Sequence, residues 1–168
     1  MENLDNNINS TEETKYTFLR VLCYLSMFAN GSNAFRSASS AITLKNPDEV
    51  YQLNLQFNET LASIQEFYPE EVLLLMRNFY EIYLLNIVNI SAVDFVAHVI
   101  GFMGAFFMNK FMKKGFYLYV ASQLVLVVNL YLFLPMNMLG TVWVIWQVFI
   151  GAIFTIMYAT QFKKLVNA

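Results

Sequence analysis

The chain has 168 residues, of which 58% are hydrophobic, 17% aromatic and only 13% charged. This apolar share exceeds that of soluble domains and predicts a membrane protein. The net charge of -2 provides no basic field for nucleic acid, so we expect no DNA or RNA partner.

The chain begins with a polar segment, residues 1–14, which contains several acidic side chains and almost no apolar ones. Such a segment buries too little surface to offset the entropy lost on ordering. We therefore predict a disordered cytoplasmic tail at 1–14, followed by a single membrane domain at 15–168.

The first apolar segment, residues 16–44, is long enough to cross a bilayer but contains many polar residues. Small and polar side chains recur every three or four positions, at Cys23, Ser26, Asn30, Asn33, Ser37 and Ser40. This spacing places them on one face of a helix, and predicts a spanning helix that packs against other protein. A cleaved signal peptide is the alternative, but the acidic residues before the apolar core argue against it.

Two helix starts follow in the segment 46–88, which is predicted to lie outside the cytoplasm. Asn46 can cap a helix that has Pro47 at its first position and acidic residues in its first turn, and Pro69 opens a similar pattern. The spacing of Leu53, Phe57 and Leu61 among polar residues is that of an amphipathic helix. The segment therefore predicts two amphipathic extracytoplasmic helices.

Three further apolar segments are predicted to span the membrane, at about 90–109, 116–134 and 141–162. Lysines follow the first and the third of these, and Trp143 and Trp146 lie near the start of the last. With residues 16–44, the prediction is an all-α bundle of four transmembrane helices.

The distribution of basic residues predicts the orientation, because cytoplasmic loops are enriched in Lys and Arg. If the loop between 109 and 116 is cytoplasmic, only Arg36, Lys45 and Arg77 lie outside. The other seven are then inside: Lys15, Arg20, Lys110, Lys113, Lys114, Lys163 and Lys164. Both termini are thus predicted to be cytoplasmic.

Asp94 and His98 are the candidate functional residues. They lie four residues apart on one helix face, and ionisable groups at membrane depth are costly enough to suggest a function. We expect both to face the bundle interior, where Asn30 and Asn33 offer polar partners. The pair can act as a proton or ion relay, or it can join helices by hydrogen bonds.

Small residues predict where helices approach closely. Ala97, Gly101 and Ala105 continue the face of Asp94 and His98, and a second stripe comprises Gln147, Gly151 and Thr155. Stripes of this kind allow neighbouring backbones to pack together in membranes.

Two stretches of the chain resemble a known family. Leu22-Cys23-Tyr24-Leu25-Ser26 and Phe111-Met112-Lys113-Lys114-Gly115-Phe116-Tyr117-Leu118-Tyr119, together with Gln123, are similar to small uncharacterised bacterial four-helix integral membrane proteins. The resemblance implies a four-span layout in the bacterial inner (plasma) membrane, and it brings no activity or ligand with it.

For function, the sequence favours a non-enzymatic interaction or accessory protein that contacts membrane lipids and binds itself or other membrane proteins. The alternative is a small transporter or channel with a polar intramembrane centre around Asp94 and His98. An enzyme ranks last, because no nucleophile motif or set of metal ligands is present; we expect no metal and no cofactor.

Overall fold

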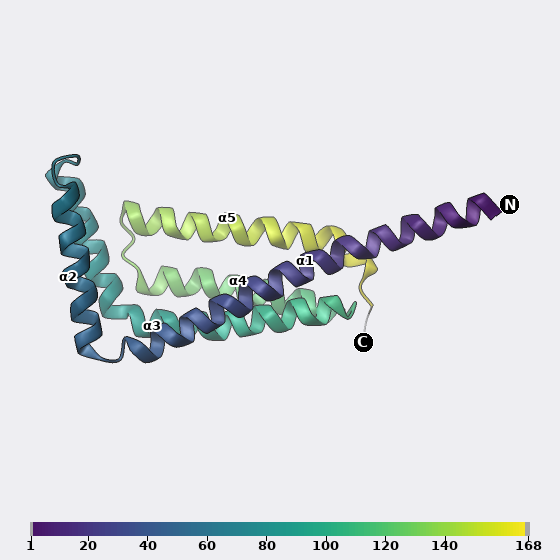
Figure 1. The fold of residues 1–168 in the computed structure, drawn as a ribbon, viewed down its shortest axis with the longest axis horizontal. Helices are drawn as coiled ribbons and strands as arrows, with labels where there is room; N and C mark the ends of the chain where they lie inside the picture. The colour runs from purple at the N-terminus through teal and green to yellow at the C-terminus, as the bar shows by residue number, and fades with distance from the viewer. Residues whose placement is uncertain (1, 167–168) are drawn as a thin grey trace.

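A computed structural model describes the backbone of residues 2–166 and the side chains from residue 17 onward. Within this part the chain is helical: α1 (Glu2–Thr43), α2 (Pro47–Ile64), α3 (Glu70–Asn109), α4 (Lys113–Phe133), α5 (Met138–Gln161) and the short 3-10 helix η1 (Phe162–Lys164). Helices α1, α4, α5 and most of α3 run along one long axis, and α2 lies across one end (Figure 1). We call this the α2 end, and we call the other the lysine end, after Lys110, Lys113, Lys114, Lys163 and Lys164.

Three of these helices are long and apolar enough to cross a membrane: Glu70–Asn109, Lys113–Phe133 and Met138–Lys164. The prediction of four transmembrane helices is therefore wrong. Helix α1 extends beside the others but is not among the helices apolar enough to cross a membrane. Its polar stripe and its two arginines, Arg20 and Arg36, lower its mean hydropathy. Three such helices make this a membrane protein.

The helix expected between residues 70 and 88 is also not a separate element. It forms the first half of α3, which continues unbroken to Asn109, or about 60 Å at 1.5 Å per residue. No proline and no glycine occurs between Glu70 and Gly101, so the sequence contains no residue that would end the helix there. The first turns of α3 run beside α2, and the rest turns along the bundle (Figure 1).

The predicted tail at residues 1–14 overlaps the start of α1, whose backbone is helical from Glu2. The side chains of residues 1–16 lie outside the described part, so the tail remains a prediction.

Helix α2 begins as its cap predicts and packs on the start of α3. The Asn46 side chain accepts a hydrogen bond from the Asp48 backbone N–H at 3.1 Å. The rings of Phe57 and Tyr80 stack with their centroids 3.8 Å apart, and the Tyr80 hydroxyl donates to the Leu53 carbonyl at 3.4 Å. The apolar face of α2 is thus partly covered by α3.

Glycines bring α3 and α4 into close contact near the lysine end. A Cβ atom on Gly104 would lie 2.7 Å from the Tyr119 backbone nitrogen, and one on Gly115 would lie 2.5 Å from the Gly104 carbonyl oxygen. Only residues without side chains allow two helix backbones to approach this closely.

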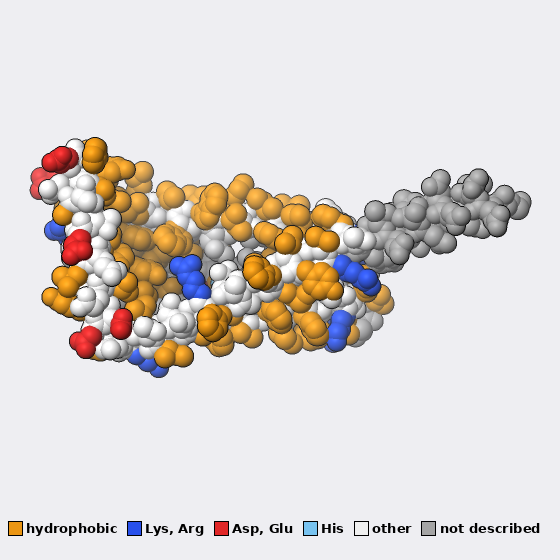
Figure 2. Space-filling model, in the orientation of Figure 1, with side chains coloured by type: hydrophobic (Ala, Val, Ile, Leu, Met, Phe, Trp, Pro, Cys, Tyr) orange, Lys and Arg blue, Asp and Glu red, His pale blue; other side chains and the backbone are white. Residues whose placement is uncertain are grey.

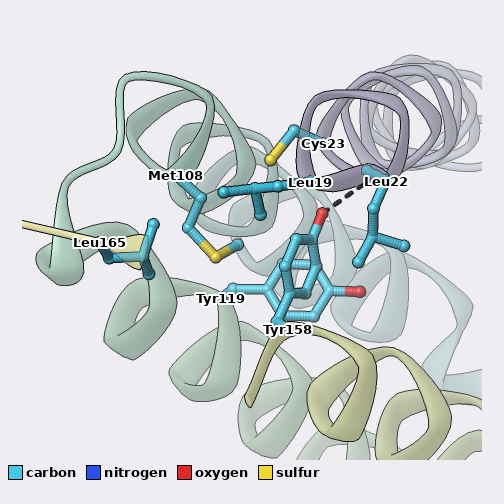
Figure 3. Packing of buried hydrophobic residues seen from close by; sticks show 7 residues of the cluster. All are labelled: Leu19, Leu22, Cys23, Met108, Tyr119, Tyr158 and Leu165. Atoms are coloured by element: carbon cyan, nitrogen blue, oxygen red, sulfur yellow. Dashed lines mark hydrogen bonds between the residues drawn. The ribbon is translucent and has the colours of Figure 1, made fainter. Parts of the chain in front are cut away.

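A buried cluster closes the bundle at the lysine end (Figure 3). It comprises Leu19, Leu22, Cys23, Met108, Tyr119, Tyr158 and Leu165. The Tyr158 hydroxyl donates to the Leu22 carbonyl at 3.0 Å and so ties α5 to α1. The Tyr119 and Tyr158 rings meet edge to face, with centroids 4.9 Å apart.

The acidic side chains are unevenly distributed along the long axis. In the view of Figure 2 the acidic side chains gather at the α2 end, whereas hydrophobic side chains dominate the length between the two ends. At the lysine end, Lys110 and Lys114 lie over the rings of Phe106 and Phe107, at 4.4 and 5.1 Å from the centroids. Such cation–aromatic pairs are typical of a membrane–water interface.

Candidate functional site

A cavity of about 510 Å³ lies between α1, α3, α4 and α5, and it is partly open, because Ala29, Asn33 and Arg36 on its wall are exposed. Polar groups from all four helices line it: Ser26, Asn30, Asn33, Arg36, Ser37, Ser40, Ser91, Asp94, His98, Gln123 and Gln147. Its remaining walls are apolar or aromatic. Tyr119 belongs both to this wall and to the buried cluster, so the cluster bounds the cavity on the side of the lysine end.

His98 contacts α1 through Asn30, whose side chain is 6% exposed. The Asn30 amide nitrogen donates to the Ser26 carbonyl at 2.8 Å, and its oxygen therefore faces His98, with Nδ1 at 3.1 Å. Since this oxygen can only accept, Nδ1 of His98 carries the hydrogen. A neutral His98 then leaves Nε2 as a hydrogen-bond acceptor.

Asp94 contacts α4 instead of α1. The Asn129 amide nitrogen donates to the Asp94 carboxylate at 2.8 Å and also to the Ile90 carbonyl at 3.0 Å. Asn129 is buried, and its two hydrogen bonds to α3 hold the Asp94 carboxylate against α4. We expected both ionisable residues to find polar partners at Asn30 and Asn33 of α1, and in the structure only His98 does so, through Asn30.

Asp94 and His98 share a helix face and line the same cavity, but the described part of the chain contains no hydrogen bond between them. Each is joined to a different helix. Asn33, the fourth predicted site residue, lines the cavity with an exposed side chain. A proton relay between the two ionisable groups would need a bridging ligand or water in the cavity.

The predicted small-residue stripe on α3 lies in the interior. Ala97 and Ala105 are fully buried, and a Cβ on Gly101 would lie 2.6 Å from the Asn30 oxygen. Gly101 therefore lets Asn30 reach His98. Glycine at this position serves the site as well as the packing.

The stripe on α5 is less buried. Gly151 is buried, and a Cβ there would lie 3.0 Å from the Gln123 amide oxygen of α4. Gln147 lines the cavity, and Thr155 is half-buried.

No family model, curated protein or solved structure matches this chain. The suspected bacterial family stays a prediction, and the site has to be interpreted from its own geometry.

Sequence reasoning missed three contacts that shape the site. The pairing of Asn129 with Asp94 requires knowing which helix lies opposite, although its position in an apolar segment marked it as a polar group needing a partner. The Gly104–Gly115 contact and the Tyr158 hydrogen bond each join segments whose proximity no local pattern predicts.

The described residues contain no group of three His, Cys, Asp or Glu side chains able to hold a metal ion. What the cavity offers is one carboxylate, one imidazole, one guanidinium and several amides and hydroxyls, beside aromatic rings. This set can bind and orient a polar solute by hydrogen bonds and charge.

Proposed function

We propose that this protein is a multi-pass protein of the bacterial inner membrane that binds a small solute within its helix bundle and acts as a small transporter. The observation that carries the proposal is the 510 Å³ cavity in which the half-buried Asp94 and His98 face the same space as Asn30. Ligand cavities typically have 300–1,000 Å³ and combine apolar walls with a few polar groups.

The open space argues against a purely structural role for the polar residues. Amides and carboxylates that only join helices need to be enclosed by packed side chains, because an unfilled polar space in a bilayer is costly. Here the hydrogen bonds of Asp94 and His98 to neighbouring helices coexist with a cavity large enough for a solute.

Orientation is part of the proposal. We place the lysine end and the C-terminus in the cytoplasm and the α2 end outside, because basic residues favour the cytoplasmic side. The cavity then lies nearer the outside, with the buried cluster between it and the cytoplasm. The predicted cytoplasmic N-terminus depends on α1 as well, and remains a prediction.

Thermal unfolding of the purified protein in mild detergent tests solute binding. A panel of neutral, cationic, anionic and zwitterionic solutes should contain at least one that raises the melting temperature, because binding to the folded state stabilises it. Ala29→Trp, which fills the cavity, should abolish the shift. The control Ala92→Trp, on an exposed α3 position that does not line the cavity, should keep it. No shift with any solute would contradict the proposal.

Transport is tested in three sets of liposomes, which contain the wild-type protein, the Ala29→Trp variant or the Ala92→Trp variant. The solute that stabilises wild-type protein should enter the vesicles with wild type and Ala92→Trp but not with Ala29→Trp. Binding without uptake would reduce the proposal to a solute-binding protein.

A non-enzymatic interaction protein is the second candidate, and the exposure of α5 favours it. This helix is the least buried of the three apolar helices, and Ile145, Trp146 and Ile156 are each more than 60% exposed. A lipid contact accounts for this face, but so does a second copy. The mass of the protein–detergent complex tests the choice: a dimer that dissociates in Trp146→Ala favours self-association.

A further inference from the structure

Two opposite charges lie on the wall of the cavity without a charged partner. Arg36 projects from α1 and Asp94 from α3, and both line the same space. Among the described residues neither side chain forms an ion pair, and the one hydrogen-bond partner of Asp94 is the neutral Asn129 amide. Asp94 is half-buried between the helices, where an uncompensated charge is costly, whereas Arg36 is exposed at the cavity wall. A ligand that brings an ammonium to Asp94 and an anionic group to Arg36 pairs both charges.

The helix register places these two charges at nearly the same depth. Asn30 and His98 are in contact and define one level on the antiparallel α1 and α3. From that level, Arg36 lies six residues, or about 9 Å, toward the α2 end, and Asp94 lies four residues, or about 6 Å, in the same direction. Their backbones thus differ in depth by only about 3 Å. Tyr83 lies within electrostatic range of both.

Aromatic side chains on the wall of the polar cavity connect it with an apolar space. Phe79, Tyr80 and Trp143 line the polar cavity and also line a second cavity of about 570 Å³. The second cavity is otherwise walled by Phe57, Met76, Leu139, Val142 and Trp146. Aromatic faces attract ammonium groups, and the adjoining space suits a hydrocarbon group.

We propose that the cavity takes a zwitterion that carries an apolar group, with its ammonium at Asp94, its anionic group at Arg36 and its apolar group toward the second cavity. A ligand with only one charge would leave either Asp94 or Arg36 unpaired. Two sources share this chemistry: a free amphipathic amino acid and the head group of a zwitterionic phospholipid. The inference rests on the proposed solute-binding function and specifies its ligand class.

Isothermal titration in detergent tests the ligand class with a matched set of probes. Leucine carries both charges, 3-methylbutylamine lacks the carboxylate, and 4-methylpentanoate lacks the amine. The lipid arm compares dihexanoyl phosphatidylethanolamine with dihexanoyl phosphatidylglycerol, which has no ammonium. We expect one of the two zwitterions to bind at least about tenfold more tightly than its single-charge analogues, since each charge-assisted contact contributes more than 1.4 kcal/mol. Which zwitterion binds identifies the source.

Charge variants then test the two contacts separately. Asp94→Asn should weaken zwitterion binding about tenfold and leave 4-methylpentanoate binding unchanged, whereas Arg36→Gln should weaken zwitterion binding and leave 3-methylbutylamine unchanged. The matched controls Glu81→Gln and Arg77→Gln change exposed α3 residues outside both cavities and should have no effect.

The outcomes separate this inference from the proposed function. If single-charge or neutral solutes bind as tightly as both zwitterions, or if the control variants weaken binding equally, the zwitterion inference is wrong while solute binding stands. If no probe binds to wild-type protein and no solute stabilises it against heat, both are wrong.

Discussion

At the scale of single residues, the site combines side chains that are held by different neighbours. Gly101 admits the Asn30 amide, which in turn fixes the tautomer of His98, and Asn129 holds Asp94. Two ionisable groups on one helix face are therefore positioned independently, by α1 and by α4. This arrangement lets a change at one of them leave the other in place.

Cys23 provides a residue-scale prediction. The thiol is fully buried beside Tyr158, and burial raises its pKa to about 11. Because the thiolate is the reactive form, alkylation of folded protein at pH 7 should be slow, should speed up as pH rises toward that pKa, and should be rapid after denaturation. Maleimide labelling followed by mass spectrometry measures this. Ser32→Cys in a Cys23→Ala background, at an exposed α1 position, should react quickly in the fold; equal rates at the two positions would contradict the burial.

At the scale of elements, the α3–α4 contact depends on glycine. Gly104→Ala places a methyl group 2.7 Å from the Tyr119 nitrogen and 2.9 Å from the Gly115 oxygen, and neither backbone atom can move without separating the helices. We expect a loss of about 1–3 kcal/mol in the free energy of unfolding, the usual cost of overpacking.

Gly31→Ala is the matched control for that variant. Its Cβ would meet only the Phe102 ring, at 3.7 Å, which is an ordinary contact. Alanine there should be neutral or should stabilise α1 by up to about 1 kcal/mol through helix propensity. Thermal unfolding in detergent compares the two; similar melting temperatures for both variants would show that the close contact is not essential.

At the scale of the whole molecule, charge and hydropathy organise the protein along one axis. Acidic side chains gather at the α2 end, most of the basic residues lie at the lysine end, and three apolar helices connect the two ends. The cavity lies between these ends, bounded on one side by the buried cluster.

Reporter fusions test this orientation. Fusions after residues 112 and 166, at the lysine end, should report a cytoplasmic location, and fusions after residues 60 and 136, at the α2 end and in the α4–α5 connection, an external one. The opposite pattern would invert the protein in the membrane. A fusion at residue 5 reports separately on the N-terminus, whose side follows from α1.

The sequence by itself determined the helical class, the cap at Asn46 and the apolar segments that became α4 and α5, because these depend on local propensity and composition. It also identified most of the polar residues that come to line the cavity, since a 3.6-residue period shows which side chains share a face, but it missed Arg36 and Ser91. It failed at α1, where a polar stripe was taken to be compatible with a membrane span, and in the first half of α3, which was expected to be a separate extracytoplasmic helix.

Only the tertiary structure decided which face meets which neighbour. Periodicity shows that Asp94 and His98 point the same way, but the rotation and order of the helices determine that one meets Asn129 and the other Asn30. The close contact of Gly104 with Gly115 and the shared cavity of Arg36 and Asp94 likewise join segments far apart in the chain. Such contacts depend on how whole helix surfaces fit together, and no local pattern contains that information.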